Sequence, residues 1–298
     1  MTTPRFYCPE ILAQSGTAEL PEQAAHHAAR VLRLQAGDRV SVFNGRGGEG
    51  EARITDIGKR NVTLEIVDWH AVERESPLQV LLAQAISAGE KMDFTLQKAV
   101  ELGIGNIQPL ASERSVVRLS GERAEKRVAH WQGVVVAACE QSGRNHVPEV
   151  APIRPLLDWL GACRTYGDRS ENSAGRGQIL PVLQVNSHSI DQKSGEIWTA
   201  QADSQPIHHE SDRFLVQQDG AELRLMLSPV AEIGLRDLPK PTGNITLLIG
   251  PEGGLSPVEA EAAQRYGFTP VRLGARVLRT ETAALAALAA MQMLWGDF

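Results

Sequence analysis

Residues 245–257 read ITLLIGPEGGLSP, and this stretch decides the class of fold. The apolar run Ile245–Ile249 predicts a buried strand. Ser256, Pro257 and Glu259 predict the start of a helix, since they suit the N-cap, the first helical position and the third position of a capping box. A buried strand that enters a helix through a glycine-rich loop is typical of an α/β fold with a parallel sheet.

The loop between this strand and this helix is a candidate ligand site. Glycines at 250, 253 and 254 expose backbone N–H groups and let a ligand approach closely, and Glu252 can pair with a hydroxyl or a cation. Ligands of open α/β sheets bind beyond the carboxyl ends of the strands, where this loop is expected. A tight turn with no ligand is the alternative.

A second loop of the same kind follows at residues 273–282, LGARVLRTET, and enters the Ala/Leu-rich helix 283–290. The two loops together could hold one flat ligand. The small side chains of the helix indicate a crowded core or a subunit interface. Arg279 and Glu281 stand at the helix start, where a buried core would exclude both. A structural ion pair between them is the alternative to a role in catalysis.

The chain divides into two predicted domains. Residues 40–68 alternate with period two and predict a small antiparallel sheet or barrel, preceded by a helix over 21–34. Ser76-Pro77 marks the boundary, which gives domains 1–75 and 76–298. In the second domain we predict strands at 78–86, 104–110, 223–227, 245–249 and 270–273, and helices at 91–102, 122–141, 155–160, 256–266 and 280–295.

Residues 167–217 are rich in Ser, Gly, Gln, Asp and His, and predict a surface insertion, partly or wholly disordered. Its histidines are interpreted as solvated residues, so no metal is expected. The G-x-G-x-x-G at 45–50 lies between strand segments, which argues against dinucleotide binding.

Composition sets further limits. The formal net charge is −6, which argues weakly against a large nucleic-acid footprint. The three cysteines form neither a disulfide framework nor a zinc pattern. The chain shows no signal peptide and no membrane-spanning run, so a soluble, cytoplasmic protein is expected.

Several stretches in this order resemble the ribosomal RNA small-subunit methyltransferase E family, the uridine-N3 methyltransferases of 16S rRNA within the SPOUT superfamily. They are Lys91-Met92-Asp93, Glu113-Arg114-Ser115, Glu140-Gln141-Ser142-Gly143-Arg144, Ile249–Gly254, and Leu273-Gly274 with Leu278–Ala283. The resemblance implies a PUA-like barrel for RNA at the N-terminus, a C-terminal parallel sheet with a trefoil knot, a homodimer, and S-adenosylmethionine as the cofactor. The substrate it implies is a uridine near the decoding centre, and the expected context is the assembled small ribosomal subunit.

The resemblance implies the cofactor residues, the chemistry of methyl transfer to uracil N3 indicates the catalytic candidates, and positive charge indicates the RNA contacts. Arg279 is the candidate for stabilising the uracil anion, and Glu281 or Glu252 for the base, in that order. The cofactor residues would be Leu248, Gly250, Pro251, Glu252, Gly253, Gly254, Leu273, Gly274, Val277, Leu278, Arg279, Thr282 and Ala283. The candidate RNA contacts are Arg30, Arg33, Arg46, Lys59, Arg60, Arg114, Arg118 and Arg144.

Three other functions remain open at this point. A methyltransferase of this superfamily could act on another RNA, such as tRNA. A ribosome-assembly factor could bind RNA without catalysis. A nicotinamide-dependent dehydrogenase would suit the α/β pattern, but the glycine fingerprint it needs lies in the predicted hairpin.

Overall fold

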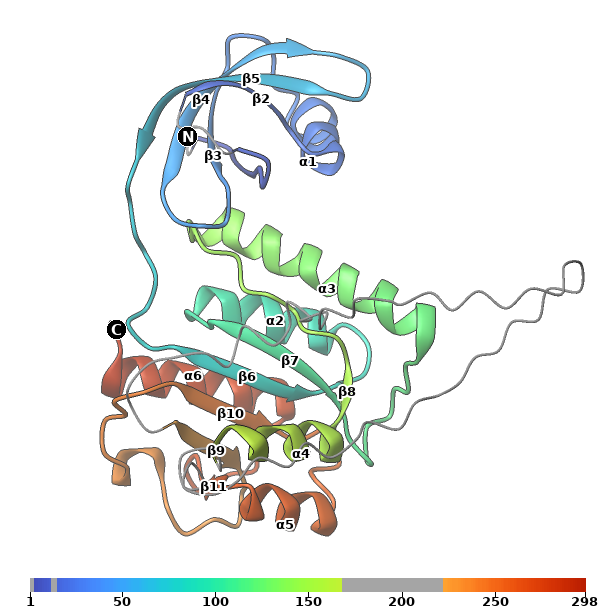
Figure 1. The fold of residues 1–298 in the computed structure, drawn as a ribbon, viewed down its shortest axis with the longest axis vertical. Helices are drawn as coiled ribbons and strands as arrows, with labels where there is room; N and C mark the ends of the chain where they lie inside the picture. Colours follow the sequence, from blue (N-terminus) through green and yellow to red (C-terminus); the bar gives the residue numbers. More distant parts are fainter. Residues whose placement is uncertain (1–2, 12–14, 168–221) are drawn as a thin grey trace, which may run out of the picture.

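The computed structural model describes residues 3–11, 15–167 and 222–298, and these residues form two β-sheets (Figure 1). Most of the predicted insertion at 167–217 lies outside the described residues. Figure 1 shows the N-terminal sheet at one end of the molecule and the helix α3 lying between it and the second sheet.

The N-terminal sheet has five strands in the order β1-β3-β4-β5-β2. Neighbouring strands are antiparallel, except that β1 and β3 are parallel. The prediction of a small antiparallel sheet over residues 40–68 is therefore confirmed, and the predicted helix before it is a short α-helix that continues as a π-helix. The elements are β1 (Arg5–Tyr7), β2 (Gly16–Glu19), α1 (Glu22–His26), the π-helix η1 (His27–Val31), β3 (Arg39–Phe43), β4 (Glu49–Ile57) and β5 (Val62–His70).

The second sheet has six strands, all parallel, in the order β11-β9-β10-β6-β7-β8. This arrangement confirms the predicted α/β domain, and the trefoil knot stays a prediction. Its strands are β6 (Val80–Ala85), β7 (Asn106–Ala111), β8 (Arg154–Pro155), β9 (Leu223–Leu227), β10 (Ile245–Ile249) and β11 (Thr269–Val271).

Helices cover both faces of this sheet, which is why its central strands are mainly apolar. Along β10, Leu247 and Ile249 pack with α2, α3 and α6, whereas Leu248 packs with α4 and α5 on the other face. Each of these three side chains is 2% exposed or less. The helices are α2 (Lys91–Glu101), α3 (Gly121–Ser142), α4 (Leu156–Gly167), α5 (Pro257–Arg265) and α6 (Thr280–Trp295). No helix in the described ranges is both long and apolar enough to cross a membrane.

Several elements differ from the sequence prediction. The strands β1 and β2 and the 3-10 helix η3 (Leu235–Asp237) were not predicted. The helix α4 continues to Gly167, beyond the predicted end at Leu160, because packing overrides the low helix propensity of Gly161. The strand β8 comprises only Arg154 and Pro155 and was not predicted. Two exposed residues without an apolar pattern give no periodic signal.

The N-terminal sheet docks onto the end of α3. The Arg5 guanidinium donates to the carbonyl oxygens of Cys139 at 2.8 Å and Arg144 at 3.0 Å, and it lies 3.8 Å from the ring centre of Phe43. The backbone N–H of Tyr7 donates to the Glu140 carboxylate at 2.9 Å. The Glu140–Arg144 stretch therefore joins the two sheets.

Arg144, predicted as an RNA contact, has a structural position instead. Its side chain forms an ion pair with Glu75 and donates to the carbonyl oxygens of Val100 at 3.1 Å and Ile104 at 2.8 Å. The residue is 5% exposed. Because these partners occupy the buried guanidinium, we do not include Arg144 among the proposed RNA contacts.

We expect Arg144→Met to lower the free energy of unfolding by about 3 kcal/mol, since it leaves the Glu75 carboxylate and two carbonyl oxygens without their partner. Urea denaturation measures the change. Arg118→Met is the matched control, because Arg118 is exposed and its guanidinium donates only to the Glu113 carbonyl among the described residues. The control should change the stability by less than about 0.5 kcal/mol. Equal effects of the two variants would contradict the structural role of Arg144.

Candidate cofactor pocket

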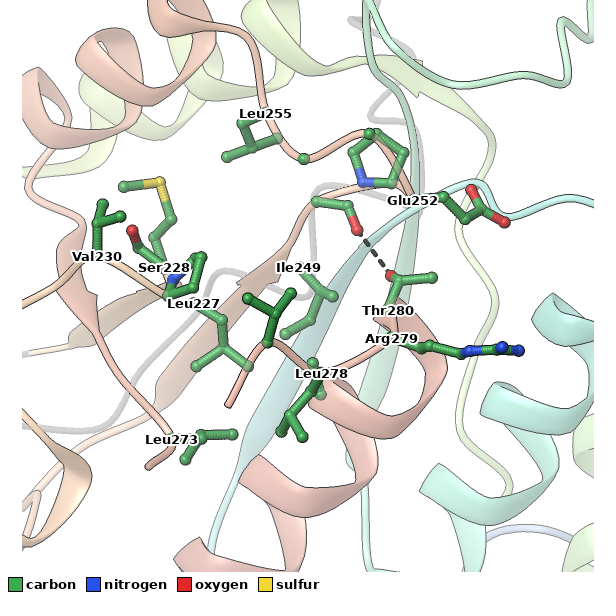
Figure 2. Close-up of a pocket in the computed structure, with 18 of the residues that line it drawn as sticks. Leu227, Ser228, Val230, Ile249, Glu252, Leu255, Leu273, Leu278, Arg279 and Thr280 are labelled. Atoms are coloured by element: carbon green, nitrogen blue, oxygen red, sulfur yellow. Dashed lines mark hydrogen bonds between the residues drawn. The ribbon is translucent and has the colours of Figure 1, made fainter. Parts of the chain in front are cut away.

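A cavity of about 790 Å³ lies at the carboxyl ends of β9, β10 and β11 and at the start of α6. This is the edge at which open parallel sheets bind ligands, and the volume is in the range of small-molecule sites. Figure 2 shows apolar side chains from several of these elements around the hollow, among them Leu227, Ile249, Leu273 and Leu278.

The loop after β10 forms one wall of the cavity, and two of its glycines are required by the geometry. Gly254 has φ +68°, in the left-handed region, and its N–H donates to the Pro251 carbonyl at 2.8 Å. A Cβ atom on Gly250 would lie 3.1 Å from the Leu255 nitrogen. The chain therefore makes a tight turn whose remaining backbone groups border the cavity.

The predicted capping box is present at the start of α5, and its glutamate has a second role. The Glu259 carboxylate accepts from the Ser256 N–H at 2.9 Å, and also from the Ser112 hydroxyl at 3.0 Å and the Glu113 N–H at 2.8 Å. Glu259 is 3% exposed. The same buried carboxylate thus begins α5 and fixes the loop that follows β7.

This fixed loop places Arg114 against the loop after β10. The Arg114 guanidinium donates to the carbonyl oxygens of Gly253 at 3.1 Å and Leu255 at 3.3 Å. Arg114 is exposed and borders the cavity. The predicted RNA contact therefore lies at the rim of the pocket, beside its glycine-rich wall.

The second predicted loop forms the opposite wall and is tied to the first. The Thr280 hydroxyl donates to the Gly250 carbonyl at 2.7 Å, the dashed contact in Figure 2. The two loops thus meet at the cavity, as the sequence predicted. Ten of the predicted cofactor residues line it: Gly250, Pro251, Glu252, Gly253, Gly254, Leu273, Val277, Leu278, Arg279 and Ala283.

Three predicted cofactor residues do not line the cavity, and one segment was missed. Leu248 packs on the face of the sheet that α4 and α5 cover, and Gly274 and Thr282 are also outside the lining. The missed segment is Met226–Val230, at the end of β9. The sequence pattern that could have identified this segment is the predicted strand 223–227 followed by Ser-Pro. A third parallel strand that ends there places its loop at the same edge of the sheet as the other two loops.

Glu252 is held at the cavity rim. Its carboxylate accepts from the Ala88 N–H at 3.1 Å and from the Lys91 ammonium at 3.2 Å. Partial burial raises the pKa of Glu252, but hydrogen bonds from its own and the Ala88 N–H and the charge of Lys91 outweigh burial and leave the pKa below its usual value. Glu252 is therefore an anion at neutral pH.

The other two candidate catalytic residues differ in position. Arg279 is exposed, lines the cavity and extends away from the apolar side chains in the view of Figure 2. Glu281, one residue into α6, lies outside the lining, and its buried Oε2 has no hydrogen-bond partner among the described residues. The structure shows no ion pair between Arg279 and Glu281 in the part of the chain that it describes.

Known proteins share both the sequence and the fold. Residues 74–188 and 203–292 match the family described as the RNA methyltransferase domain, and residues 20–67 match the RNA methyltransferase PUA domain. Ribosomal RNA small subunit methyltransferase E of Buchnera aphidicola is 31% identical over 99% of this chain and 97% of its own. The chain belongs to the ribosomal RNA small subunit methyltransferase E family.

Two solved structures resemble this family member over 100% of both chains. Ribosomal RNA small subunit methyltransferase E of Neisseria gonorrhoeae, bound to S-adenosyl methionine, is 38% identical with a TM-score of 0.74. A putative methyltransferase of Legionella pneumophila, in complex with the same cofactor, is 32% identical with a TM-score of 0.76. Within the described ranges, no three His, Cys, Asp or Glu side chains are grouped to hold a metal ion.

The contacts of Glu252 in this methyltransferase predict a pH-dependent contribution to stability. A carboxyl group whose folded-state pKa is lowered stabilises the fold above its unfolded pKa, about 4.3, and loses that contribution as the pH falls through the folded pKa. We expect the wild type to be more stable than Glu252→Gln at pH 7, and the difference to shrink below about pH 4. Urea midpoints across this range test it. A difference that does not change with pH would contradict the ionised pair.

Proposed function

We propose that this chain transfers a methyl group from S-adenosylmethionine to N3 of a uridine in 16S rRNA, near the decoding centre. The observation that carries the proposal is the cavity in which the two predicted loops meet at the carboxyl edge of the sheet. The relatives named above, two of them solved with the cofactor, support both the cofactor and the class of substrate.

The residues present fit this cofactor. The left-handed Gly254 and the crowded Gly250 make a tight backbone turn at the cavity wall, which suits polar groups of a nucleoside. Leu227, Ile249 and Leu278 offer an apolar surface to a flat base. When bound, the cofactor supplies an electrophilic methyl group on a sulfonium, so the protein has to position the acceptor and help its proton to leave.

Arg279 is the proposed stabiliser of the uracil anion. Removal of the N3 proton places negative charge on O2 and O4 of the base, and a guanidinium at the cavity rim lowers the energy of that charge. Of the two candidate carboxylates, Glu252 lines the cavity and Glu281 does not, which favours Glu252 as the proton acceptor. The lowered pKa of Glu252 makes it a weak base. We therefore assign the larger contribution to catalysis to Arg279.

The rim of the cavity suits an anionic polymer. Among the described residues, five cationic side chains line it against the single carboxylate of Glu252: Lys91, Arg114, Arg272, Arg276 and Arg279. This local excess opposes the overall charge of −6. A positive rim on an acidic protein favours RNA at this edge over contact along the whole surface.

A second group of cations supports RNA contact by the N-terminal domain. Arg30, Lys59 and Arg60 line a cavity of about 700 Å³ between the α1–η1 segment and the turn from β4 to β5. Arg33, two residues after the π-helix, has φ +56°, a conformation that costs energy outside glycine. We propose that this cavity contacts RNA phosphates, with the exposed Arg46 and Arg118 as further contacts.

We further propose a cytoplasmic homodimer that acts on the assembled small ribosomal subunit. The end of α6 supports a second copy, because Met293 is 67% exposed and Leu294 is 46% exposed. These two neighbouring apolar side chains lie on a helix that otherwise packs in the core, and a second copy would cover them. A dimer would also present two sets of RNA contacts to one particle.

Methyl transfer from labelled S-adenosylmethionine to small ribosomal subunits tests the function, with subunits from cells that lack the enzyme and mapping of the labelled nucleotide. Label on uridine N3 near the decoding centre is the expected result. No transfer with intact cofactor binding would indicate another RNA. Loss of cofactor binding as well would indicate a non-catalytic assembly factor.

We expect Arg279→Ala to lower kcat by about 100-fold, the usual effect of removing one donor to a developing oxyanion. The same transfer assay measures it. The Kd for S-adenosylmethionine should change little, because the proposed cofactor contacts are the backbone turn and apolar groups. Arg279→Lys, which keeps the charge, should recover part of the rate. Normal turnover by Arg279→Ala would contradict the electrostatic role.

We expect the triple variant Arg30→Ala, Lys59→Ala, Arg60→Ala to bind ribosomal RNA more weakly, with a salt dependence that is less steep by about 2 to 3 in log–log slope. Fluorescence anisotropy at several salt concentrations measures both quantities. Arg39→Ala is the matched control, since Arg39 is an exposed arginine of the same domain outside this cavity. An equal loss in the control, or no loss in the triple variant, would contradict the site.

A further inference from the structure

A chain of hydrogen bonds runs beneath the cofactor cavity from the middle of the sheet to the glycine-rich loop. Gln84 lies in β6 and is 0% exposed, and Thr280, the first residue of α6, is 6% exposed. The Gln84 amide nitrogen donates to the Thr280 hydroxyl at 3.2 Å, and the Thr280 hydroxyl donates to the Gly250 carbonyl at 2.7 Å. These hydrogen bonds connect three elements of the fold: β6, α6 and the loop after β10.

The direction of each bond in the chain is fixed. The Gln84 amide nitrogen also donates to the Ala85 carbonyl at 2.9 Å, and a carbonyl oxygen can only accept. The nitrogen of the amide must therefore face this side, because the amide oxygen would meet another acceptor there. Thr280 accepts the bond from Gln84, so its single proton is left for Gly250.

Stability alone does not account for Gln84. A buried amide costs free energy unless its groups are paired, and the Gln84 Oε1 has no partner among the described residues. The residues two positions before and after Gln84, Leu82 and Ile86, are buried and apolar. An apolar side chain at position 84 would avoid the cost of the unpaired oxygen. What the amide adds at this position is the pair of bonds that its nitrogen donates to Thr280 and Ala85.

We propose that Gln84 and Thr280 are positioning residues for the cofactor. They hold the Gly250 carbonyl toward α6 and so fix the first peptide of the loop, whose residues 250–254 line the cavity. The inference rests on the proposed function, because it assigns the loop to S-adenosylmethionine. It adds that the affinity for this cofactor depends on two residues, of which one, Gln84, lies outside the cavity lining.

Three variants test the proposal by isothermal titration with S-adenosylmethionine on folded protein. Thr280→Val keeps the shape and removes the hydroxyl, and should raise the Kd about tenfold. Thr280→Ser keeps the hydroxyl and should stay within about twofold of the wild type. Gln84→Met removes the donor to Thr280 and should weaken binding several-fold. In steady-state assays the KM for the cofactor should rise in Thr280→Val while the KM for RNA stays unchanged.

A matched control separates positioning from packing. Thr246 is 3% exposed, lies near the start of β10, and its hydroxyl donates to Glu222 at the edge away from the cavity. Thr246→Val should lower the stability and leave the Kd for the cofactor unchanged.

A Thr280→Val Kd within twofold of the wild type would overturn the proposal, and so would a Thr280→Ser that binds as weakly as Thr280→Val. If Thr280→Val does not fold, Gln84→Met decides, and a wild-type Kd in that variant overturns the proposal. A wild-type protein that does not bind S-adenosylmethionine would instead contradict the proposed function.

Discussion

The parallel direction of all six strands in the second sheet is the constraint on which the rest of the structure depends. Because the strands point the same way, every loop that leaves a carboxyl end does so at one edge. Segments that are far apart in the sequence, at the ends of β9, β10 and β11, therefore share one cavity. Helices on both faces bury the strands, so the free backbone groups of this domain are concentrated where the loops turn.

Buried polar residues keep this edge in a fixed shape. Glu259 joins the start of α5 to the loop after β7, and Thr280 joins the start of α6 to the loop after β10. Arg5 holds the N-terminal sheet against the end of α3, and Arg144 joins that end to Glu75 and to the turn after α2. In each case a charged or polar side chain joins two elements through hydrogen bonds, which fix the orientation of one element against the other. The cofactor cavity and the proposed RNA contacts are thus parts of one scaffold.

Residue patterns predicted much of this arrangement. The continuous apolar runs predicted β9 and β10 to the residue, and the cap residues and alanine content predicted α5 and α6. The same patterns could not give the strand order, in which β9 lies between β10 and β11, so the contribution of residues 226–230 to the cavity was missed. They also could not separate a buried arginine from an exposed one, because residue type alone does not report burial. Arg144 and Arg118 look alike in the sequence and differ in the fold.

A crystal structure of this chain with S-adenosylmethionine tests the central claim most directly. The account predicts the adenosine between the loop that follows Ile249 and the loop that follows Leu273, with backbone groups of residues 250–254 bonded to it and the methyl group directed toward the positive rim at Arg279. Cofactor bound elsewhere on the protein, or bound here with the methyl group directed into the apolar wall at Leu227, would contradict it.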